Sequence, residues 1–252
     1  MLIGVSTNCD MASPLETVLE RLAEMTDLVE IQCDANHSLF RHAAVCDRFD
    51  LRYTIHAPTG DGNIAAPLEP IRRATVAMLA ETAAMADAVG AEKLVIHPGF
   101  CMYPDEWDAS VAALYRSLAE LGEVQGRYSV QFVIENMGSW TCCHFRTPEL
   151  LPVIRGAGLG FALDVGHAHL CGTLSGFLAE HPDHVHLHDN HGCMDEHAAC
   201  GSGMIHFSEV MRRISGSTAV VEVIRPEDVR SSLAYLKTAS AESLITFHDE
   251  IV

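Results

Sequence analysis

The chain has 252 residues, of which 48% are hydrophobic, and its 16 basic and 34 acidic side chains give a formal net charge of −18. The hydrophobic content supports a sizeable core. The acidic balance makes nucleic acid an unlikely partner, because it repels phosphate backbones at long range. No apolar stretch reaches the ~18 residues that would suggest a membrane span.

The beginning of the chain, MLIGVSTNCD, predicts a first strand rather than a signal peptide. It has no basic residues ahead of its apolar run, and that run is short. With no export signal, we expect a cytoplasmic protein whose nine cysteines stay reduced.

Short runs rich in Val, Ile and Leu recur along the chain and are typical of parallel strands covered on both faces. In chain order they span residues 2–7, 28–33, 52–57, 93–97, 129–135, 159–164, 184–189 and 217–223.

Helical segments are predicted between these runs, at residues 13–25, 38–48, 69–89, 105–121, a short stretch from 147, 173–180, 209–214 and 227–240. Ser13 opens a capping box with a proline at the first helical position, and Ser208 is the predicted cap of helix 209–214. Gly90 and Gly122 are predicted helix stops. Residues 241–252 are predicted only as an end segment that packs on the rest.

Regular alternation of strand and helix predicts an α/β fold with a parallel sheet. Eight such units in a chain of this length predict closure into a single (β/α)₈ TIM barrel, one domain over residues 1–252. The competing fold is an open doubly wound sheet. That fold normally has a glycine-rich loop after its first strand, and residues 6–9 (STNC) are not one.

Most of these strands end in side chains that can bind a metal. The nine candidates are His56, His97, Glu135, Asp164, His167, His186, Asp195, His197 and Glu222. A lone histidine at a strand end is more often a structural residue than a ligand. Four carboxylates and five imidazoles at one barrel mouth, however, would be desolvated together, and divalent cations that accept mixed N and O ligands would stabilise them.

The motifs that contain these residues resemble those of the superfamily that includes endonuclease IV and the xylose-isomerase-like sugar isomerases and epimerases. They are HAP, HPG, IEN, LDxGHAH, VHLHDN, DEHxxxGxGxI and VEV, within about residues 52–225. Cys200 stands where the sixth motif usually has a hydrophobic residue.

The likeness to endonuclease IV implies three metal groups: His56, His97 and Glu135; Glu135, Asp164, His186 and Glu222; and His167, Asp195 and His197. The likeness to sugar isomerases implies only the second group. By this resemblance His186 is the ligand of its strand, and His188 is expected either to support the ligands or to contact substrate.

Two enzyme classes follow from this difference. Retention of all nine ligand types favours a multinuclear phosphoester hydrolase with up to three Zn²⁺ ions, acting on a small phosphorylated or nucleotide-like substrate. The alternative is a sugar or sugar-phosphate isomerase or epimerase with one ion, Mn²⁺ being the second choice of metal, in which Glu135 and Glu222 act as paired acid and base. An AP endonuclease acting on DNA is disfavoured by short loops and acidic charge. A non-catalytic metal-binding protein remains a further alternative.

Two arginines beyond the ligand set are candidates for binding an anionic oxygen. Arg146 follows Glu135 in the next loop, and Arg225 lies three residues beyond Glu222. A guanidinium matches phosphate in bidentate fashion. Trp140 could stack on a sugar ring or pack under its loop. The cysteines near Asp195 are expected to be spectators rather than zinc ligands.

Overall fold

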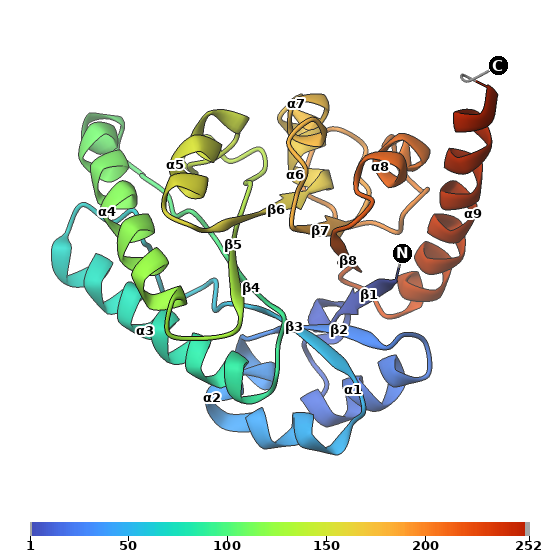
Figure 1. The fold of residues 1–252 in the computed structure, drawn as a ribbon, viewed down its shortest axis with the longest axis horizontal. Coiled ribbons are helices and arrows are strands. Elements are labelled where there is room, and N and C mark those ends of the chain that lie inside the picture. Colours follow the sequence, from blue (N-terminus) through green and yellow to red (C-terminus); the bar gives the residue numbers. More distant parts are fainter. Residues whose placement is uncertain (1, 250–252) are drawn as a thin grey trace.

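The computed structural model describes residues 2–249, in which the strands close into one parallel barrel (Figure 1). Each strand pairs with the next, and β1 closes the ring against β8, with Val5 opposite Val221. The strands are β1 (Ile3–Ser6), β2 (Leu28–Gln32), β3 (Arg52–His56), β4 (Lys93–Ile96), β5 (Gln131–Glu135), β6 (Gly160–Asp164), β7 (His184–Leu187) and β8 (Thr218–Val221). The predicted (β/α)₈ barrel is confirmed.

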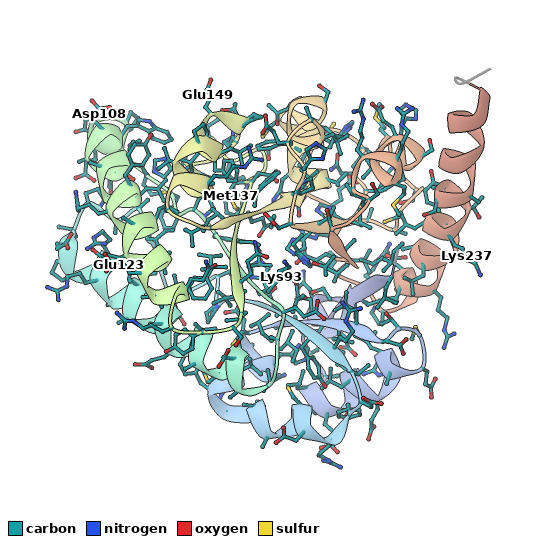
Figure 2. The ribbon with its side chains drawn as sticks, viewed as in Figure 1. Lys93, Asp108, Glu123, Met137, Glu149 and Lys237 are labelled. Carbon is teal, nitrogen blue, oxygen red and sulfur yellow. The ribbon has the colours of Figure 1, made fainter. Side chains whose placement is uncertain are left out.

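Helices surround the ring of strands in Figure 1. They are α1 (Leu15–Ala23), α2 (Leu39–His42), α3 (Glu69–Ala88), α4 (Trp107–Gln125), α5 (Leu151–Gly156), α6 (Val165–Leu170), α7 (Leu174–Leu178), α8 (Phe207–Arg213) and α9 (Glu227–Asp249). Short 3-10 helices are η1 (Thr7–Asp10), η2 (Ala35–His37), η3 (Ala43–Arg48), η4 (Pro104–Glu106) and η5 (Pro148–Leu150). Figure 2 shows charged side chains such as Asp108 and Glu123 at the periphery.

The apolar core lies mainly between the strands and the helices. Alternate strand residues such as Phe132 and Phe161 point outward into it and are almost fully buried. Each such side chain contributes about 1.5–3 kcal/mol of hydrophobic burial. A second, small cluster of Val95, Val133 and Ala162 comes from the opposite alternation and lies inside the ring.

The predicted starts of two helices are wrong in detail. Helix α1 has Pro14 as its N-cap and no side-chain capping bond, so Ser13 forms no capping box; the Ser13 amide instead donates to Asp10 Oδ1 at 3.2 Å. Helix α8 begins earlier than predicted, with His206 and not Ser208 as its N-cap.

Gly122 does not end helix α4, which continues to Gln125. A Cβ at residue 122 would lie 2.1 Å from the carbonyl oxygen of Ala157. The glycine therefore permits close packing of α4 on the end of α5. Gly90 does follow its helix, in the left-handed conformation with φ of +70°.

The predicted helix 227–240 extends as α9 to Asp249, so most of the predicted end segment 241–252 continues this helix, and residues 250–252 lie outside the described part of the chain. Among the described helices, none is both long and apolar enough to cross a membrane.

Candidate metal centre

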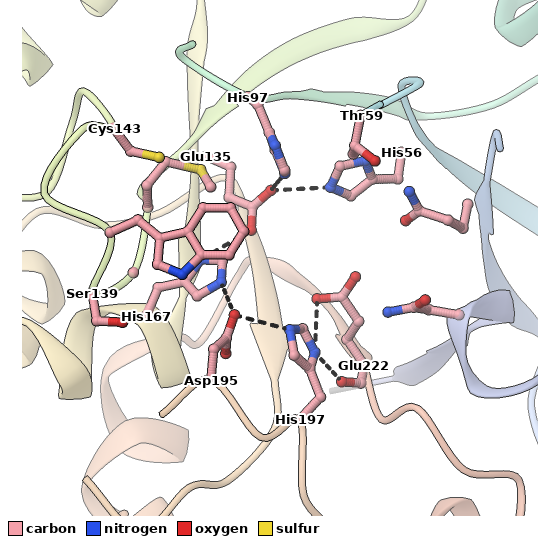
Figure 3. A pocket seen from close by; sticks show the side chains of 15 residues that line it. His56, Thr59, His97, Glu135, Ser139, Cys143, His167, Asp195, His197 and Glu222 are labelled. Carbon is pink, nitrogen blue, oxygen red and sulfur yellow. Dashed lines mark hydrogen bonds and ion pairs between the residues drawn. The ribbon is translucent and has the colours of Figure 1, made fainter. Parts of the chain in front are cut away.

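The carboxyl ends of the strands meet at one mouth of the barrel, because all eight described strands are parallel. The mouth holds a pocket of about 250 Å³ (Figure 3). Seven of the nine predicted ligands line it: His56, His97, Glu135, His167, Asp195, His197 and Glu222. The other two, Asp164 and His186, are fully buried at strand positions directly opposite each other. The structure therefore brings all nine to one end of the barrel.

His56, His97 and Glu135 form the first group of side chains. The Nε2 atoms of His56 and His97 lie 3.0 and 3.2 Å from Glu135 Oε2. Burial disfavours a charged His56, but its hydrogen bond to Glu135 and the charge of that carboxylate outweigh burial and raise the pKa of His56 to about 9. Burial raises the pKa of Glu135, but the charges of His186 and His97 outweigh burial and hold this pKa well below its usual range.

The second group consists of Glu135, Asp164, His186 and Glu222, whose donor atoms all lie within 4.8 Å of one another. His186 Nδ1 is 3.3 Å from Glu135 Oε1, 3.3 Å from Glu222 Oε2 and 3.8 Å from Asp164 Oδ2. Three carboxylates thus converge on one imidazole nitrogen in a buried position. Glu135 belongs to both this group and the first.

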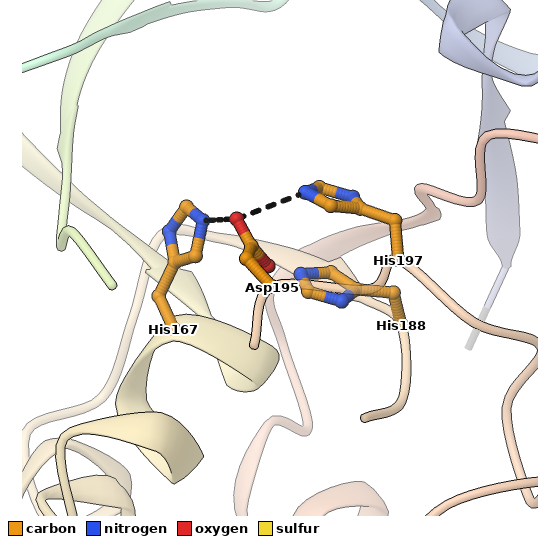
Figure 4. Close-up of side chains that lie close together, drawn as sticks. All are labelled: His167, His188, Asp195 and His197. Carbon is orange, nitrogen blue, oxygen red and sulfur yellow. Dashed lines mark hydrogen bonds and ion pairs between the residues drawn. The ribbon is translucent and has the colours of Figure 1, made fainter. Parts of the chain in front are cut away.

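The third group consists of His167, Asp195 and His197, with His188 beside them (Figure 4). Asp195 Oδ2 lies 3.0 Å from His167 Nε2 and 3.4 Å from His197 Nε2. Burial opposes a charged His197, but Asp195 outweighs it and raises the pKa of His197 to about 9. The backbone at His197 is left-handed, with φ of +45°.

His188 is fully buried, and its ring stacks on that of His197 at 3.9 Å. Its Nε2 lies 3.0 Å from Asp164 Oδ1, while its Nδ1 is without a hydrogen-bond partner among the described residues. This places His188 within reach of the third group, and it does not line the pocket. Its predicted contact with substrate stays a prediction.

Asp189 anchors the loop that carries Asp195 and His197. Its carboxylate accepts hydrogen bonds from the backbone amides of Asn190, Gly201, Gly203 and Ile205 at 2.9–3.1 Å. A Cβ at Gly203 would lie 2.4 Å from Asp189 Oδ1, so the second glycine of the GxGxI motif lets the backbone approach the carboxylate. No sequence pattern points to this role of Asp189.

Asn136 fixes the end of β6, where Asp164 is located. Its side chain accepts from the Asp164 amide at 2.8 Å and donates to the Asp164 carbonyl oxygen at 3.0 Å. Its own carbonyl oxygen lies 3.0 Å from His167 Nδ1. The asparagine of the IEN motif therefore orients residues of both the second and the third group.

Glu30 is a buried carboxylate of the barrel interior that the sequence analysis did not select. It lies in the middle of β2, and its two oxygens are each 2.9 Å from an imidazole nitrogen, one of His184 and one of His186. Burial raises the pKa of Glu30, but the charges of His186 and His184 outweigh it and hold the pKa well below its usual range. The signal was present, since Glu30 interrupts an apolar strand as Glu135 and Glu222 do.

The two arginines predicted to bind an anion do not line the pocket. Arg146 Nε donates to the carbonyl oxygen of Gly138 at 3.0 Å, and Arg225 Nε pairs with Asp228 at 2.8 Å on the surface. Their role in binding substrate stays a prediction. Trp140 does line the pocket and is 73% exposed. The nine cysteines are free, and none belongs to a candidate metal group of the described chain.

The residues present fit a divalent cation. Each group mixes imidazole nitrogens with carboxylate oxygens, the donor types that Zn²⁺ and related ions accept in proteins. Three nearly fully buried carboxylates in the second group would be costly to ionise together without a cation. The donor atoms are close enough for one ion to bind several of them at once.

Comparison with known proteins places this chain in a family. A family model described as xylose isomerase-like TIM barrel matches residues 20–239. An uncharacterized protein of Methanocaldococcus jannaschii is 32% identical over 226 residues, 87% of this chain and 90% of that protein.

Two solved structures share the whole fold with this chain. A D-tagatose 3-epimerase-like protein is 27% identical, with a TM-score of 0.88 over 98% of this chain and all of the other. A protein from Thermus thermophilus, soaked with zinc chloride, is 26% identical, with a TM-score of 0.78 over 96% of this chain and 99% of the other.

Proposed function

Because the chain belongs to the xylose isomerase-like TIM-barrel family, we propose that it is a metal-dependent sugar epimerase or isomerase. Glu135, Asp164, His186 and Glu222 would hold one divalent ion. The observation that carries the proposal is the position of two glutamates around His186 Nδ1, each 3.3 Å from it. The similarity to a D-tagatose 3-epimerase-like protein supports the same reaction class.

Paired glutamates suit proton transfer at a carbon beside a carbonyl group. One carboxylate would remove the proton from that carbon, and the electron pair would delocalise onto the carbonyl oxygen. The other would return a proton to the opposite face of that carbon in an epimerase. In an isomerase the proton would return to the former carbonyl carbon, while the hydroxyl proton of the first carbon moves to the former carbonyl oxygen. A bound divalent ion supplies polarisation of the sugar oxygens and so stabilises the developing charge.

The neighbours of Glu135 fix its charge and its orientation. His56 and His97 both contact its Oε2 atom, while its Oε1 atom faces His186. These contacts keep Glu135 ionised, and they restrict its side chain to one orientation. A fixed, ionised carboxylate is the form that accepts a proton.

The pocket supports a small polar substrate. Its volume of about 250 Å³ is below the ~300–1,000 Å³ that is usual for drug-sized ligands. Amide and hydroxyl groups of Asn8, Gln32, Thr59 and Ser139 line it together with the Trp140 ring. Hydroxyl-binding groups beside an aromatic face suit a sugar.

Zn²⁺ is our first choice of metal and Mn²⁺ the second. The donor set suits zinc, and a relative of the same fold was studied with zinc chloride. A site with three carboxylates and one imidazole also suits Mn²⁺, which prefers oxygen ligands.

Deuterium exchange tests the proposed reaction. Protein supplied with Zn²⁺ or Mn²⁺ is incubated in D₂O with a panel of ketoses and aldoses, and the sugars are examined by NMR and mass spectrometry. We expect deuterium at a carbon beside the carbonyl of at least one sugar, together with its epimer or isomer. Glu222→Gln should lose this exchange. A panel without any exchange, for metal-loaded wild-type protein, would contradict the proposal.

A multinuclear phosphoester hydrolase is the second candidate, and it was the first expectation from the sequence. One observation favours it: all three predicted groups of donors come together, two more than an epimerase of this type needs. The family comparisons support the epimerase class instead. Cleavage of phosphomonoesters, phosphodiesters or abasic DNA in the absence of sugar exchange would reverse the order of the two candidates.

A further inference from the structure

Glu30 lies inside the barrel below the proposed metal centre and is fully buried. It is opposite Thr54 in the pairing of β2 with β3, and Thr54 Oγ1 donates to Glu30 Oε2 at 3.0 Å. The same oxygen is 2.9 Å from His184 Nε2. The other oxygen, Oε1, is 2.9 Å from His186 Nε2. Each oxygen of this carboxylate therefore meets one imidazole of β7.

The His186 ring joins Glu30 to the proposed ligand group. Its Nε2 edge faces Glu30, and its Nδ1 edge faces Glu135 and Glu222 at 3.3 Å each. A neutral imidazole carries a proton on one nitrogen and a lone pair on the other. The partner of Nε2 therefore decides whether the lone pair of Nδ1 is free to bind a cation.

Among the described residues, only Glu30 lies close enough to His186 Nε2 to determine which ring nitrogen carries the proton. Glu30 Oε1, His184 Nε2 and His186 Nε2 are all buried and lack a hydrogen bond of good geometry within the described part of the chain. The two histidine nitrogens lie 2.9 Å from the Glu30 oxygens, which is the distance of an ion pair. The angles of these contacts, however, depart from those of a good hydrogen bond. An ionised carboxylate can only accept, so the proton of His186 belongs on Nε2 when the two groups satisfy each other.

We propose that Glu30 is a positioning residue for the metal centre: it accepts the Nε2 proton of His186, and so fixes the ring orientation in which Nδ1 presents its lone pair to the ion. This inference rests on the proposed function. A carboxylate behind a ligating imidazole also raises the basicity of that ligand, and loss of such partners typically costs about 10–100-fold in metal affinity.

A cation bound by Glu30, His184 and His186 themselves is the competing account. These are the only described side chains that group with Glu30 as metal donors. Three donors fall short of the four that structural zinc sites use. The apolar side chains of Val95, Val133 and Ala162 also lie in the barrel interior, and Thr54 adds a hydroxyl that donates to Glu30. The positioning role therefore fits the surroundings better.

The variant Glu30→Gln tests the proposal through metal affinity, measured by chelator competition with Zn²⁺. The amide keeps the shape of the side chain but can donate toward His186. We expect affinity to fall about 10–100-fold with the number of ions per chain unchanged. Thr54→Val is the matched control, because it removes a donor to the other oxygen of Glu30 and should leave affinity near that of wild type.

Nitrogen-15 NMR of the wild-type histidines gives a readout that needs no variant and no bound metal. His186 should be the Nε2–H tautomer, with an unprotonated Nδ1 at alkaline pH. An Nδ1–H tautomer would overturn the proposal, as would unchanged affinity in a folded Glu30→Gln, or an equal loss in Thr54→Val. Loss of one ion equivalent in Glu30→Gln would favour the interior cation. If wild-type protein binds no ion, the proposed function fails, and the tautomer still decides the role of Glu30.

Discussion

Glu135 is the residue on which the candidate site is centred. It ends β5, it belongs to two of the three ligand groups, and it contacts His56, His97 and His186. An isolated carboxylate so deeply buried would be strongly destabilising, whereas one surrounded by imidazoles or cations is not. The burial of Glu135 therefore indicates a role in binding a cation or in proton transfer.

Glu135→Gln should abolish turnover while leaving the barrel folded. Loss of a proton-transferring group typically lowers kcat by about 10²–10⁴-fold, and weaker metal binding would add to this. Steady-state rates and circular dichroism measure the two effects. Glu123→Gln, on the exposed surface of α4 (Figure 2), is the control and should match wild type. Unchanged rates in Glu135→Gln would remove this residue from the mechanism.

Metal binding should release protons at neutral pH. The pKa values of His56 and His197 are raised to about 9 by Glu135 and Asp195, against the effect of burial, so both rings are protonated without metal. A cation bound beside these rings, or by them, disfavours their protonated form, so metal affinity should rise as the pH rises toward 9. Calorimetry in buffers of different ionisation enthalpy measures the release. Buffer-independent enthalpies would contradict this account.

The stability of the metal-free protein should fall as the pH rises, whereas metal affinity should rise. A histidine whose pKa is raised from 6.5 to about 9 on folding stabilises the fold fully below pH 6.5, and loses that contribution as the pH rises through 9. The melting temperature of chelator-treated protein should therefore fall over this range. Protein saturated with metal should not show the same fall.

Sequence patterns could predict most of the site at the residue scale, but not its supporting residues. The nine donors stand at or near strand ends, and parallel strands bring such ends together. Glu30 interrupts its strand in the middle and not at its end, and the Asp189 carboxylate accepts only from backbone amides, so the strand-end pattern selects neither residue. The two arginines do not line the pocket, because a side chain near the mouth in sequence can still turn to a local partner, as Arg225 does to Asp228.

At the scale of elements, the long loop after β7 is the part of the site most dependent on one residue. Asp189 holds four of its backbone amides, and the loop delivers Asp195 and His197. Left unpaired, buried amides of this kind are costly. The third ligand group should therefore depend on Asp189, although the second should not.

Asp189→Asn should lower the free energy of unfolding by on the order of 3 kcal/mol, because an amide nitrogen replaces one accepting oxygen. Chemical denaturation measures this loss. Metal affinity at the second ligand group should change much less than metal affinity at the third. Glu196→Gln, in the same loop but paired with exposed His191, is the control. Equal losses in the two variants would show that Asp189 has no special role.

Gly122→Ala tests the contact between α4 and α5. Its Cβ would meet the Ala157 carbonyl oxygen, so we expect destabilisation of about 1–3 kcal/mol, although alanine usually favours a helix. In Gly126→Ala the nearest atom is 3.6 Å away, and little change is expected. Thermal melts compare the two. The sequence suggested a helix stop at Gly122, because glycine in a helix and glycine after a helix look alike without the packing partner.

At the scale of the whole molecule, the barrel was predictable because its signals repeat eight times. The predicted strands agree with the observed ones within about two residues, since each apolar run is short and bounded by polar residues. Helix ends were less predictable, since tertiary contacts such as that of Gly122 decide them. The net charge of −18 is partly explained by carboxylates collected around one mouth.

Metal analysis tests the central claim, that cations hold these acids and imidazoles together. Protein purified without chelator, and again after chelation and reloading with Zn²⁺ or Mn²⁺, is assayed for ions per chain. We predict at least one tightly bound equivalent, and loss of that equivalent in Glu222→Gln or His186→Ala. Protein that binds neither metal under these conditions, yet is folded, would contradict the account.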